Sequence, residues 1–294
     1  MEVHYKTHRN PDTQYQDRLR QILETGDMIR DTPQGIGALT CFGTLAPMVF
    51  DLTNGFPIIT ERSLKTFWMK PIAEITAFIN GARTLDEIRQ YGCDFWEAYR
   101  GKGEMIGLGP DDMGPGSYGP SFAKFEMPDG GYLNQFEQLL QQITEFPSLR
   151  THLISPWKPY YTARGPNRKV IVAPCHGWLH FRVINGRLDM EMHQRSADFP
   201  IGVPSNMVQY AALLLMVSRT TGIPPGRYIH SFADAHIYEN QLGSAQELVS
   251  RPPLPLPVVQ LREDAGENLF AFRATDFVLS EYEAHAAMKV AFAP

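Results

Sequence analysis

The sequence of 294 residues has few cysteines, no excess of basic charge and no long hydrophobic run. Its three cysteines are too few for the disulfide scaffold of a small secreted protein, and their odd number would leave one unpaired, so we expect reduced thiols. Lys and Arg number 27 against 32 Asp and Glu, which leaves no positive charge to neutralise a nucleic-acid backbone. The longest apolar runs, such as 211–217, are too short to span a bilayer, and the polar N-terminus lacks a signal-peptide stretch. We therefore expect a cytoplasmic protein that binds neither nucleic acid nor membrane.

Common nucleotide-binding and hydrolase motifs are also missing from the sequence. No GxGxxG pattern follows a predicted strand, no Walker loop is present and no GxSxG elbow occurs. The glycines of GIGALTCFG, residues 35–43, have the wrong spacing and precede no helical pattern. What is present is a globular composition with 43% hydrophobic residues, 24 Gly and 23 Pro, which is typical of a loop-rich enzyme.

The hydrophobic pattern predicts one α+β domain with a large sheet. Helical periodicity occurs in six segments: 14–26, 70–80, 84–99, 133–145, 205–221 and 238–250. Alternation typical of strands occurs in four segments: 35–43, 47–52, 169–194 and 229–238. The Asn185–Gly186 pair predicts a hairpin, and residues 101–119 predict a long loop. Because no linker divides the chain, we expect a single domain over residues 15–294 after an N-terminal extension, residues 1–14.

A cysteine in the segment Ala173–Pro174–Cys175–His176 is the first candidate for chemistry. On a strand and directly after a proline, Cys175 would project from a fixed backbone, and its thiolate would be a strong nucleophile beside a cation. The alternative interpretation is a buried structural cysteine. His176 is not simply its general base, because adjacent strand residues point to opposite faces.

Two further clusters of polar residues suggest a binding site. Arg195 and Ser196 together offer a fork of donors and a hydroxyl for a phosphate, although a solvated polar turn would look the same. Asn206 lies at the predicted start of a helix, where its amide would either cap the helix or read the edge of an imide-like base.

The third cluster is Asp234, His236 and Tyr238, at alternating positions of one predicted strand. Such residues share one face, which predicts a pocket wall that hydrogen-bonds a ligand; an exposed sheet face is the alternative. One histidine, one carboxylate and one phenol make a poor zinc set, so we expect no metal.

Three segments resemble the active-site segments of folate-dependent thymidylate synthase and the related pyrimidine-nucleotide hydroxymethylases. They are APCHGWLHF, HQRSADFPIGVPSNMVQYA and DAHIYENQ. The similarity extends to DLTNGFPIIT, Glu74, Trp96, the SYG of residues 117–119, SPW, PPLPLP and the C-terminal HAAMKVAFAP, and covers nearly everything after residue 15. The resemblance implies a large mixed β-sheet with flanking helices, in a homodimer whose sheets stack face to face.

The resemblance also implies a reaction. Cys175 would attack carbon 6 of a pyrimidine nucleoside monophosphate, and carbon 5 would accept a one-carbon unit from the co-substrate 5,10-methylenetetrahydrofolate. The implied catalytic residues are Cys175, Glu74, Tyr118, Asp198 and His176. The implied nucleotide-binding residues are Gln194, Arg195, Ser196, Asn206, His236, Tyr238 and, reaching into the partner's phosphate site, Arg150. The implied folate-binding residues are Trp96, Asp198 and Gly202.

The sequence departs from the family pattern at the phosphate site. The family places an arginine before the early glycine pair and two adjacent arginines in the partner-derived segment, whereas Pro33 and Thr151 stand here. Each lost charge-assisted hydrogen bond is worth roughly 1.5–3 kcal/mol, or about tenfold in affinity. Compensation by His152, Arg30 or Arg168, a different substrate, and a degraded relative are the three explanations, of which we favour the first two.

The substrate base and the product follow less directly. Asn206 favours uracil, because cytosine-specific relatives tend to carry Asp at the matching position. Thymidylate synthase-like methylation of dUMP or a related uridine nucleotide is the expected activity. The alternatives are hydroxymethylation of UMP, dUMP, CMP or dCMP, as in nucleoside-antibiotic synthesis or phage DNA modification; a cysteine hydrolase; and a non-catalytic nucleotide- or folate-binding dimer.

Overall fold

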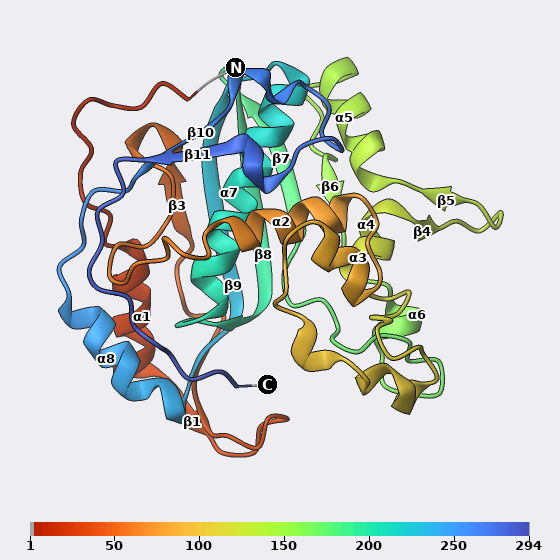
Figure 1. Cartoon of the computed structure of the whole chain (residues 1–294), viewed down its shortest axis with the longest axis horizontal. Helices are drawn as coiled ribbons and strands as arrows, with labels where there is room; N and C mark the ends of the chain where they lie inside the picture. Colours follow the sequence, from red (N-terminus) through yellow and green to blue (C-terminus); the bar gives the residue numbers. More distant parts are fainter. Residues whose placement is uncertain (1–2, 294) are drawn as a thin grey trace.

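A seven-stranded mixed sheet organises the computed structural model, which describes residues 3–293 (Figure 1). The strand order is β1-β2-β9-β8-β7-β6, and β3 also pairs with β9. The strands of this sheet are β1 (Asp27–Ile29), β2 (Ala38–Phe42), β3 (Met48–Asp51), β6 (Leu153–Ile154), β7 (Trp178–Ile184), β8 (Arg187–Asp198) and β9 (Pro225–Tyr238). Two small sheets pair β4 (Phe125–Glu126) with β5 (Tyr132–Leu133) and β10 (Val258–Leu261) with β11 (Phe277–Ser280). The predicted α+β class with a large mixed sheet is confirmed.

The turn between β7 and β8 forms as the sequence predicts. Asn185 has φ 51° and Gly186 has φ 73°, so both residues are left-handed. This is the conformation of the tight two-residue hairpin that Asn-Gly favours. The turn pairs Ile184 with Arg187 and sets the antiparallel register of the two strands.

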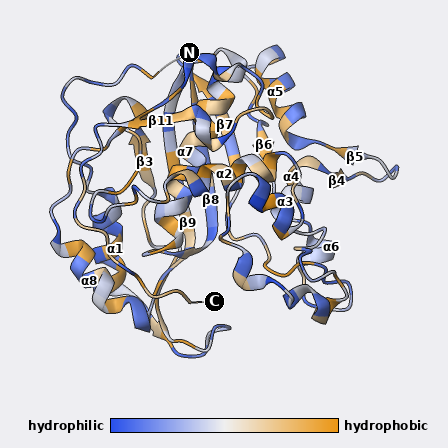
Figure 2. Cartoon of the chain, in the orientation of Figure 1, coloured by the Kyte–Doolittle hydropathy of each residue, from blue (hydrophilic) through white to orange (hydrophobic). Residues whose placement is uncertain are grey.

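Helices cover one face of the sheet and form the core with it. The helices are α1 (Gln14–Thr25), α2 (Met69–Ile79), α3 (Leu85–Gln90), α4 (Tyr118–Ala123), α5 (Gln135–Glu145), α6 (Pro159–Thr162), α7 (Gly202–Thr221) and α8 (Leu242–Ser250). Helix α7 packs on β8 and β9 and is crossed by α2, so it is apolar nearly all round. Figure 2 shows the hydrophobic residues concentrated in the central strands and the helices packed on them. None of the helices in the described range 3–293 is long and apolar enough to cross a membrane.

The connection from β8 through α7 to β9 places the candidate site residues side by side. It makes β8 and β9 parallel, whereas the other strand pairs of the sheet are antiparallel. Both strands therefore end at the same edge, where Ser196 pairs with Asp234 and Asp198 pairs with His236. Two clusters that lie nearly 40 residues apart in the sequence thus form one surface.

Three local predictions were wrong. The predicted helix over 84–99 ends at Gln90, because Gly92 has φ 102° and only a short 3-10 turn, Glu97–Tyr99, follows. Cys175 lies in a loop before β7 rather than on a strand. Helix α7 begins at Gly202, so Asn206 lies within the helix and does not cap it.

A close approach in the fold generates a first test. A Cβ atom on Gly119 would lie 1.9 Å from the backbone oxygen of Ala82, and backbone moves less readily than a side chain. Gly119→Ala should therefore reduce the free energy of unfolding by about 1–3 kcal/mol, measured by urea denaturation. Gly243→Ala in α8 is the matched control, because a Cβ there would lie more than 4 Å from the rest of residues 3–293, apart from its chain neighbours and its own helix backbone; it should be neutral or stabilising. Equal effects of the two changes would contradict the packing argument.

Candidate functional site

Two cavities meet at the edge of the sheet where β8 and β9 end. Their volumes are about 700 Å³ and about 740 Å³, within the range of small-molecule sites. Seven residues line both cavities: Gln34, Tyr99, Val172, Cys175, Ser196, His236 and Tyr238. A thiol at the boundary of two cavities lies where two bound molecules would meet.

Backbone hydrogen bonds fix the loop that carries Cys175. The Cys175 amide donates to the Tyr118 hydroxyl oxygen at 2.7 Å. The Cys175 carbonyl accepts from the amides of Arg195 and Ser196 at 2.7 and 3.2 Å. The loop is therefore held between α4 and β8, which gives the sulfur a fixed position without a strand.

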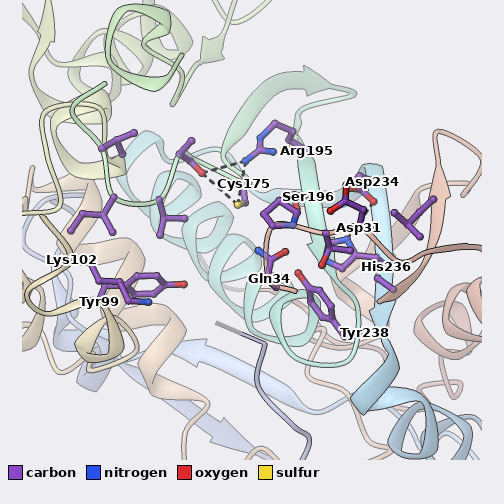
Figure 3. Close-up of a pocket in the computed structure, with 18 of the residues that line it drawn as sticks. Asp31, Gln34, Tyr99, Lys102, Cys175, Arg195, Ser196, Asp234, His236 and Tyr238 are labelled. Carbon is purple, nitrogen blue, oxygen red and sulfur yellow. Dashed lines mark hydrogen bonds and ion pairs between the residues drawn. The ribbon is translucent and has the colours of Figure 1, made fainter. Parts of the chain in front are cut away.

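Arg195 is the cation beside the sulfur. Its Nη2 donates to Cys175 Sγ at 3.4 Å (Figure 3). Its Nε donates to the Pro174 carbonyl at 3.1 Å. Burial nevertheless raises the pKa of the Cys175 thiol, Arg195 lowers it and the Asp234 carboxylate raises it further. The resulting pKa of the thiol lies above that of an ordinary cysteine, so the thiol is protonated at neutral pH.

His176 is not the partner of Cys175. Its ring stacks on Tyr118 with centroids 4.6 Å apart, and its Nδ1 lies 2.6 Å from the Tyr210 hydroxyl. Burial lowers the pKa of His176 to about 3, with a further contribution from Arg195, so the imidazole is neutral. The adjacent histidine is therefore part of a buried polar layer behind the cysteine.

The predicted polar face of β9 does line the first cavity. Asp234, His236 and Tyr238 all contribute to its wall, and His236 Nδ1 lies 3.4 Å from an Asp234 oxygen (Figure 3). Burial raises the pKa of Tyr238 to about 12, so its phenol stays protonated and can donate. Within residues 3–293, no group of three or more His, Cys, Asp and Glu side chains is arranged to hold a metal ion.

Glu74 and Asn206 are linked through a residue that the sequence analysis missed, Gln209. Glu74 accepts from Trp96 Nε1 at 2.6 Å and from Gln209 Nε2 at 2.9 Å. Gln209 in turn accepts from Asn206 Nδ2 at 2.9 Å. Burial raises the pKa of Glu74 to about 7, although both hydrogen bonds oppose the shift. A carboxyl group with a pKa near neutrality can both give and take a proton.

The second cavity contains the residues expected to bind folate. Trp96, Asp198 and Gly202 line it, together with the C-terminal segment 288–293, of which five residues contribute. Gln241 joins the segment to the site, because its Nε2 donates to Asp198 at 3.1 Å and to the Ala291 carbonyl at 3.0 Å. Burial raises the pKa of Asp198.

The basic residues near the expected phosphate site lie in different places. Arg168 lines the first cavity, whereas Arg30 is exposed, 3.5 Å from Glu239. His152 is fully buried. Arg150 is exposed, and neither it nor His152 lines either cavity as far as residues 3–293 form them. Of the three candidates for compensation, only Arg168 reaches a cavity.

Sequence signals existed for the residues that were missed. Gln209 follows Asn206 by three residues on one helix, so the two share a face, and it is polar within an apolar helix. His230 precedes Asp234, His236 and Tyr238 on the same face of β9 by the alternation of a strand. In both cases, a polar residue at a position predicted to be buried in a helix or strand was the sequence signal that could have identified it.

The arrangement around the sulfur predicts the effect of removing Arg195. Arg195→Ala should slow alkylation of Cys175 by iodoacetamide at neutral pH about tenfold or more, because a charge-assisted hydrogen bond of roughly 1.5–3 kcal/mol no longer lowers the thiol pKa. Cys41 and Cys93 are buried, so labelling reports on Cys175. Arg195→Lys keeps the charge and should give an intermediate rate. Faster alkylation of Arg195→Ala would contradict this arrangement.

The raised pKa of Glu74 predicts a pH dependence of stability. Above pH 4.5 the unfolded chain releases this proton, whereas the folded chain keeps it until about pH 7, so stability falls as the pH rises through that window. The loss is on the order of 3 kcal/mol. Glu74→Gln should therefore flatten the decline in urea-denaturation midpoint between roughly pH 5 and pH 8. A variant with the wild-type slope would show that Glu74 titrates normally.

Comparison with known families gives the site its context. The family model described as Thymidylate synthase matches residues 13–294. The match includes the loop of Cys175, both strands of the polar surface and the helix that carries Asn206. Enzymes of this kind modify carbon 5 of pyrimidines with 5,10-methylenetetrahydrofolate. The match covers nearly the whole chain, and the chain therefore belongs to the thymidylate synthase family.

Proposed function

We propose that this chain transfers a one-carbon unit from 5,10-methylenetetrahydrofolate to carbon 5 of a pyrimidine nucleoside monophosphate. The observation that supports this most directly is the position of Cys175, which lines both cavities and has Arg195 3.4 Å from its sulfur. A reaction between two bound molecules needs such a shared boundary. The single domain over residues 15–294 would carry out the whole reaction.

In this proposal the phosphate and sugar of the nucleotide occupy the first cavity, and its base lies at the boundary with the second cavity, which Glu74, Gln194 and Asn206 line. Cys175 gives its proton to solvent and adds to carbon 6 as a thiolate, and the electron pair of the carbon 5–carbon 6 bond moves towards the carbonyl at carbon 4. Carbon 5 then bonds the one-carbon unit and releases its own proton, with Tyr118 and Asp198 assisting the proton removal. Asn206, with Glu74 behind it, supplies hydrogen bonds to the oxygen that becomes negative. His236 and Tyr238 hold the sugar hydroxyl, and Gln194 and Ser196 complete the contacts to the nucleotide.

The second cavity fits the folate co-substrate. Its volume of about 740 Å³ and its lining by Phe67, Phe95, Trp96 and Phe292 suit a large, flat, partly apolar molecule. Bound folate supplies the one-carbon unit. Asp198, whose carboxyl group accepts from Gln241 in this cavity, orients the ring, and Gly202 leaves room beside it. Trp96 and the C-terminal segment 288–293 exclude water.

The phosphate site is completed by a second copy of the chain in this proposal. Arg195 and Arg168 both line the first cavity of the same chain. Arg150 is exposed, three residues before the edge strand β6, where a neighbouring molecule could reach it. A homodimer with stacked sheets would therefore bring Arg150 to its partner's site.

Methylation of a uridine nucleotide is the favoured outcome, and hydroxymethylation is the alternative. Hydride transfer gives the methyl group, whereas water gives the hydroxymethyl group. The C-terminal segment contacts the second cavity and is tied to Asp198 through Gln241, which favours the drier site and hence methylation.

Product analysis tests the proposal. The protein is incubated with 5,10-methylenetetrahydrofolate and each of dUMP, UMP, dCMP and CMP, labelled with tritium at carbon 5, and the products are identified by mass. We expect tritium release and a product of increased mass from a uridine nucleotide. Cys175→Ala should abolish both, because the nucleophile is lost, whereas Cys41→Ala, outside the two cavities as residues 3–293 line them, should retain them.

Three outcomes would overturn the proposed function. Undiminished tritium release by Cys175→Ala would exclude this nucleophile. Tight binding of nucleotide and folate without turnover of any of the four nucleotides would instead identify a non-catalytic binding dimer, and activity without folate would identify a hydrolase.

A further inference from the structure

Five buried side chains form one continuous chain of hydrogen bonds beside the second cavity. Glu74 accepts from Gln209 at 2.9 Å, Gln209 accepts from Asn206 at 2.9 Å, and Asn206 accepts from Gln194 at 3.0 Å. The last link, 2.7 Å long, joins the Gln194 carbonyl oxygen to His230 Nε2. No member is more than 5% exposed, so bulk water has little access to these bonds.

All the hydrogen bonds in this series must donate in the same direction along it. Each amide has an oxygen at one end and an amino group at the other, so reversing one link reverses every link. One end is Glu74, whose second oxygen accepts from Trp96 Nε1, a group that only donates. The other end is His230, which donates or accepts at Nε2 according to which nitrogen carries its proton.

The surroundings of His230 select one of these two states. The imidazole is fully buried, and burial together with His176 and His193 lowers its pKa well below the usual value, so it is neutral with one proton. Its Nδ1 has no hydrogen-bond partner among residues 3–293. A proton on Nδ1 would leave a buried N–H unpaired, whereas a proton on Nε2 is donated to Gln194. The histidine therefore donates, and every amide in the chain points its amino group towards Glu74.

We propose that His230 is a positioning residue that fixes the orientation of the Asn206 amide and thereby makes the site select uracil over cytosine. This inference rests on the proposed function, because it takes Asn206 as the residue that contacts the base. It adds a residue that does not touch the nucleotide and that is four hydrogen bonds away from Glu74, through Gln209, Asn206 and Gln194.

The pattern that Asn206 offers follows from the direction of the chain. The amino group is on the Glu74 side and the carbonyl oxygen is on the Gln194 side, and each has one hydrogen-bonding position left for a ligand. In the proposed reaction, negative charge collects on the oxygen at carbon 4, which lies towards the acid Glu74. The Asn206 amino group then donates to that oxygen, and its carbonyl accepts from the N3–H of uracil.

Cytosine requires the reverse pattern, because it has an acceptor at N3 and an amino group at carbon 4. Turning the Asn206 amide would place oxygen against oxygen at Gln209 and amino group against amino group at Gln194. Relief would need reversal of every link, with a proton donated by Glu74 and an unpaired N–H on His230. The site would therefore bind cytosine only at the cost of a buried hydrogen bond.

The test compares His230→Phe with the wild-type protein. Phenylalanine keeps an aromatic ring against Phe232, whose centroid is 4.4 Å away, but removes the donor. The ratio of kcat/KM for dUMP to kcat/KM for dCMP should fall about tenfold. Most of this change should be a decrease in the KM for dCMP. Tyr228→Phe is the matched control, because its buried hydroxyl has no partner among residues 3–293; its ratio should not change.

A second variant and a spectroscopic measurement keep the inference testable if His230→Phe fails to fold. In His230→Gln the new amide can turn either end to Gln194, so the ratio should also fall. In the wild-type protein, imidazole ¹⁵N shifts should show a proton on Nε2 and none on Nδ1 of His230. A protonated Nδ1, or an unchanged ratio in both variants, would overturn the inference.

The failure of this inference differs from the failure of the proposed function. If the wild-type protein releases tritium from dCMP in preference to dUMP, the proposed reaction stands and the inference is wrong. If it turns over none of the nucleotides, the proposed function fails, while the tautomer of His230 and the ratio of dissociation constants for dUMP and dCMP, measured by calorimetry, still test the inference.

Discussion

The candidate site depends on the attachment of the Cys175 loop to two different elements. The loop has no strand partner of its own, and its position follows from the Tyr118 hydroxyl on one side and the backbone of Arg195 and Ser196 on the other. These bonds also place the guanidinium of Arg195 at the sulfur. A nucleophile held in this way has a defined direction of attack, which is a large part of what an enzyme contributes to a reaction between two bound molecules.

The polar groups behind the cysteine are stable only as a complete network. Burying Glu74, Asn206 and Gln194 would be costly if any of them lacked a partner, because each unpaired buried group costs about 1–3 kcal/mol. The structure pairs each of them through Gln209 and His230. Because every polar group in the network has a partner, these residues can be buried at little cost. The same hydrogen bonds prevent the side-chain amides from turning. Under the proposed function, recognition of the base and stability of the core would therefore both follow from one set of hydrogen bonds.

The sequence predicted the regular elements better than the loops. Alternation and helical periodicity reflect which face of an element is buried, and this held for the Asn185–Gly186 hairpin and for the helix that carries Asn206. It failed for Cys175, because the alternation of residues 169–194 continues through a loop whose conformation depends on distant partners. Likewise, the Gln209 and His230 links join elements far apart in the chain. No local pattern specifies such a bond, although a polar residue in an apolar element marks where one is needed.

The charges of the first cavity connect the unusual phosphate site to the proposed dimer. The charged Asp, Lys and Arg residues of the lining are Asp31, Lys102, Arg168, Arg195 and Asp234. Three cations against two carboxylates leave an excess of one positive charge, whereas a phosphate monoester carries about −1.5 to −2 near pH 7. One chain therefore neutralises such a ligand incompletely. In the proposed dimer, the exposed Arg150 would supply the missing charge from the second copy, because it lies outside the cavity of its own chain as residues 3–293 define it. Charge balance thus favours a site completed by a second copy of the chain.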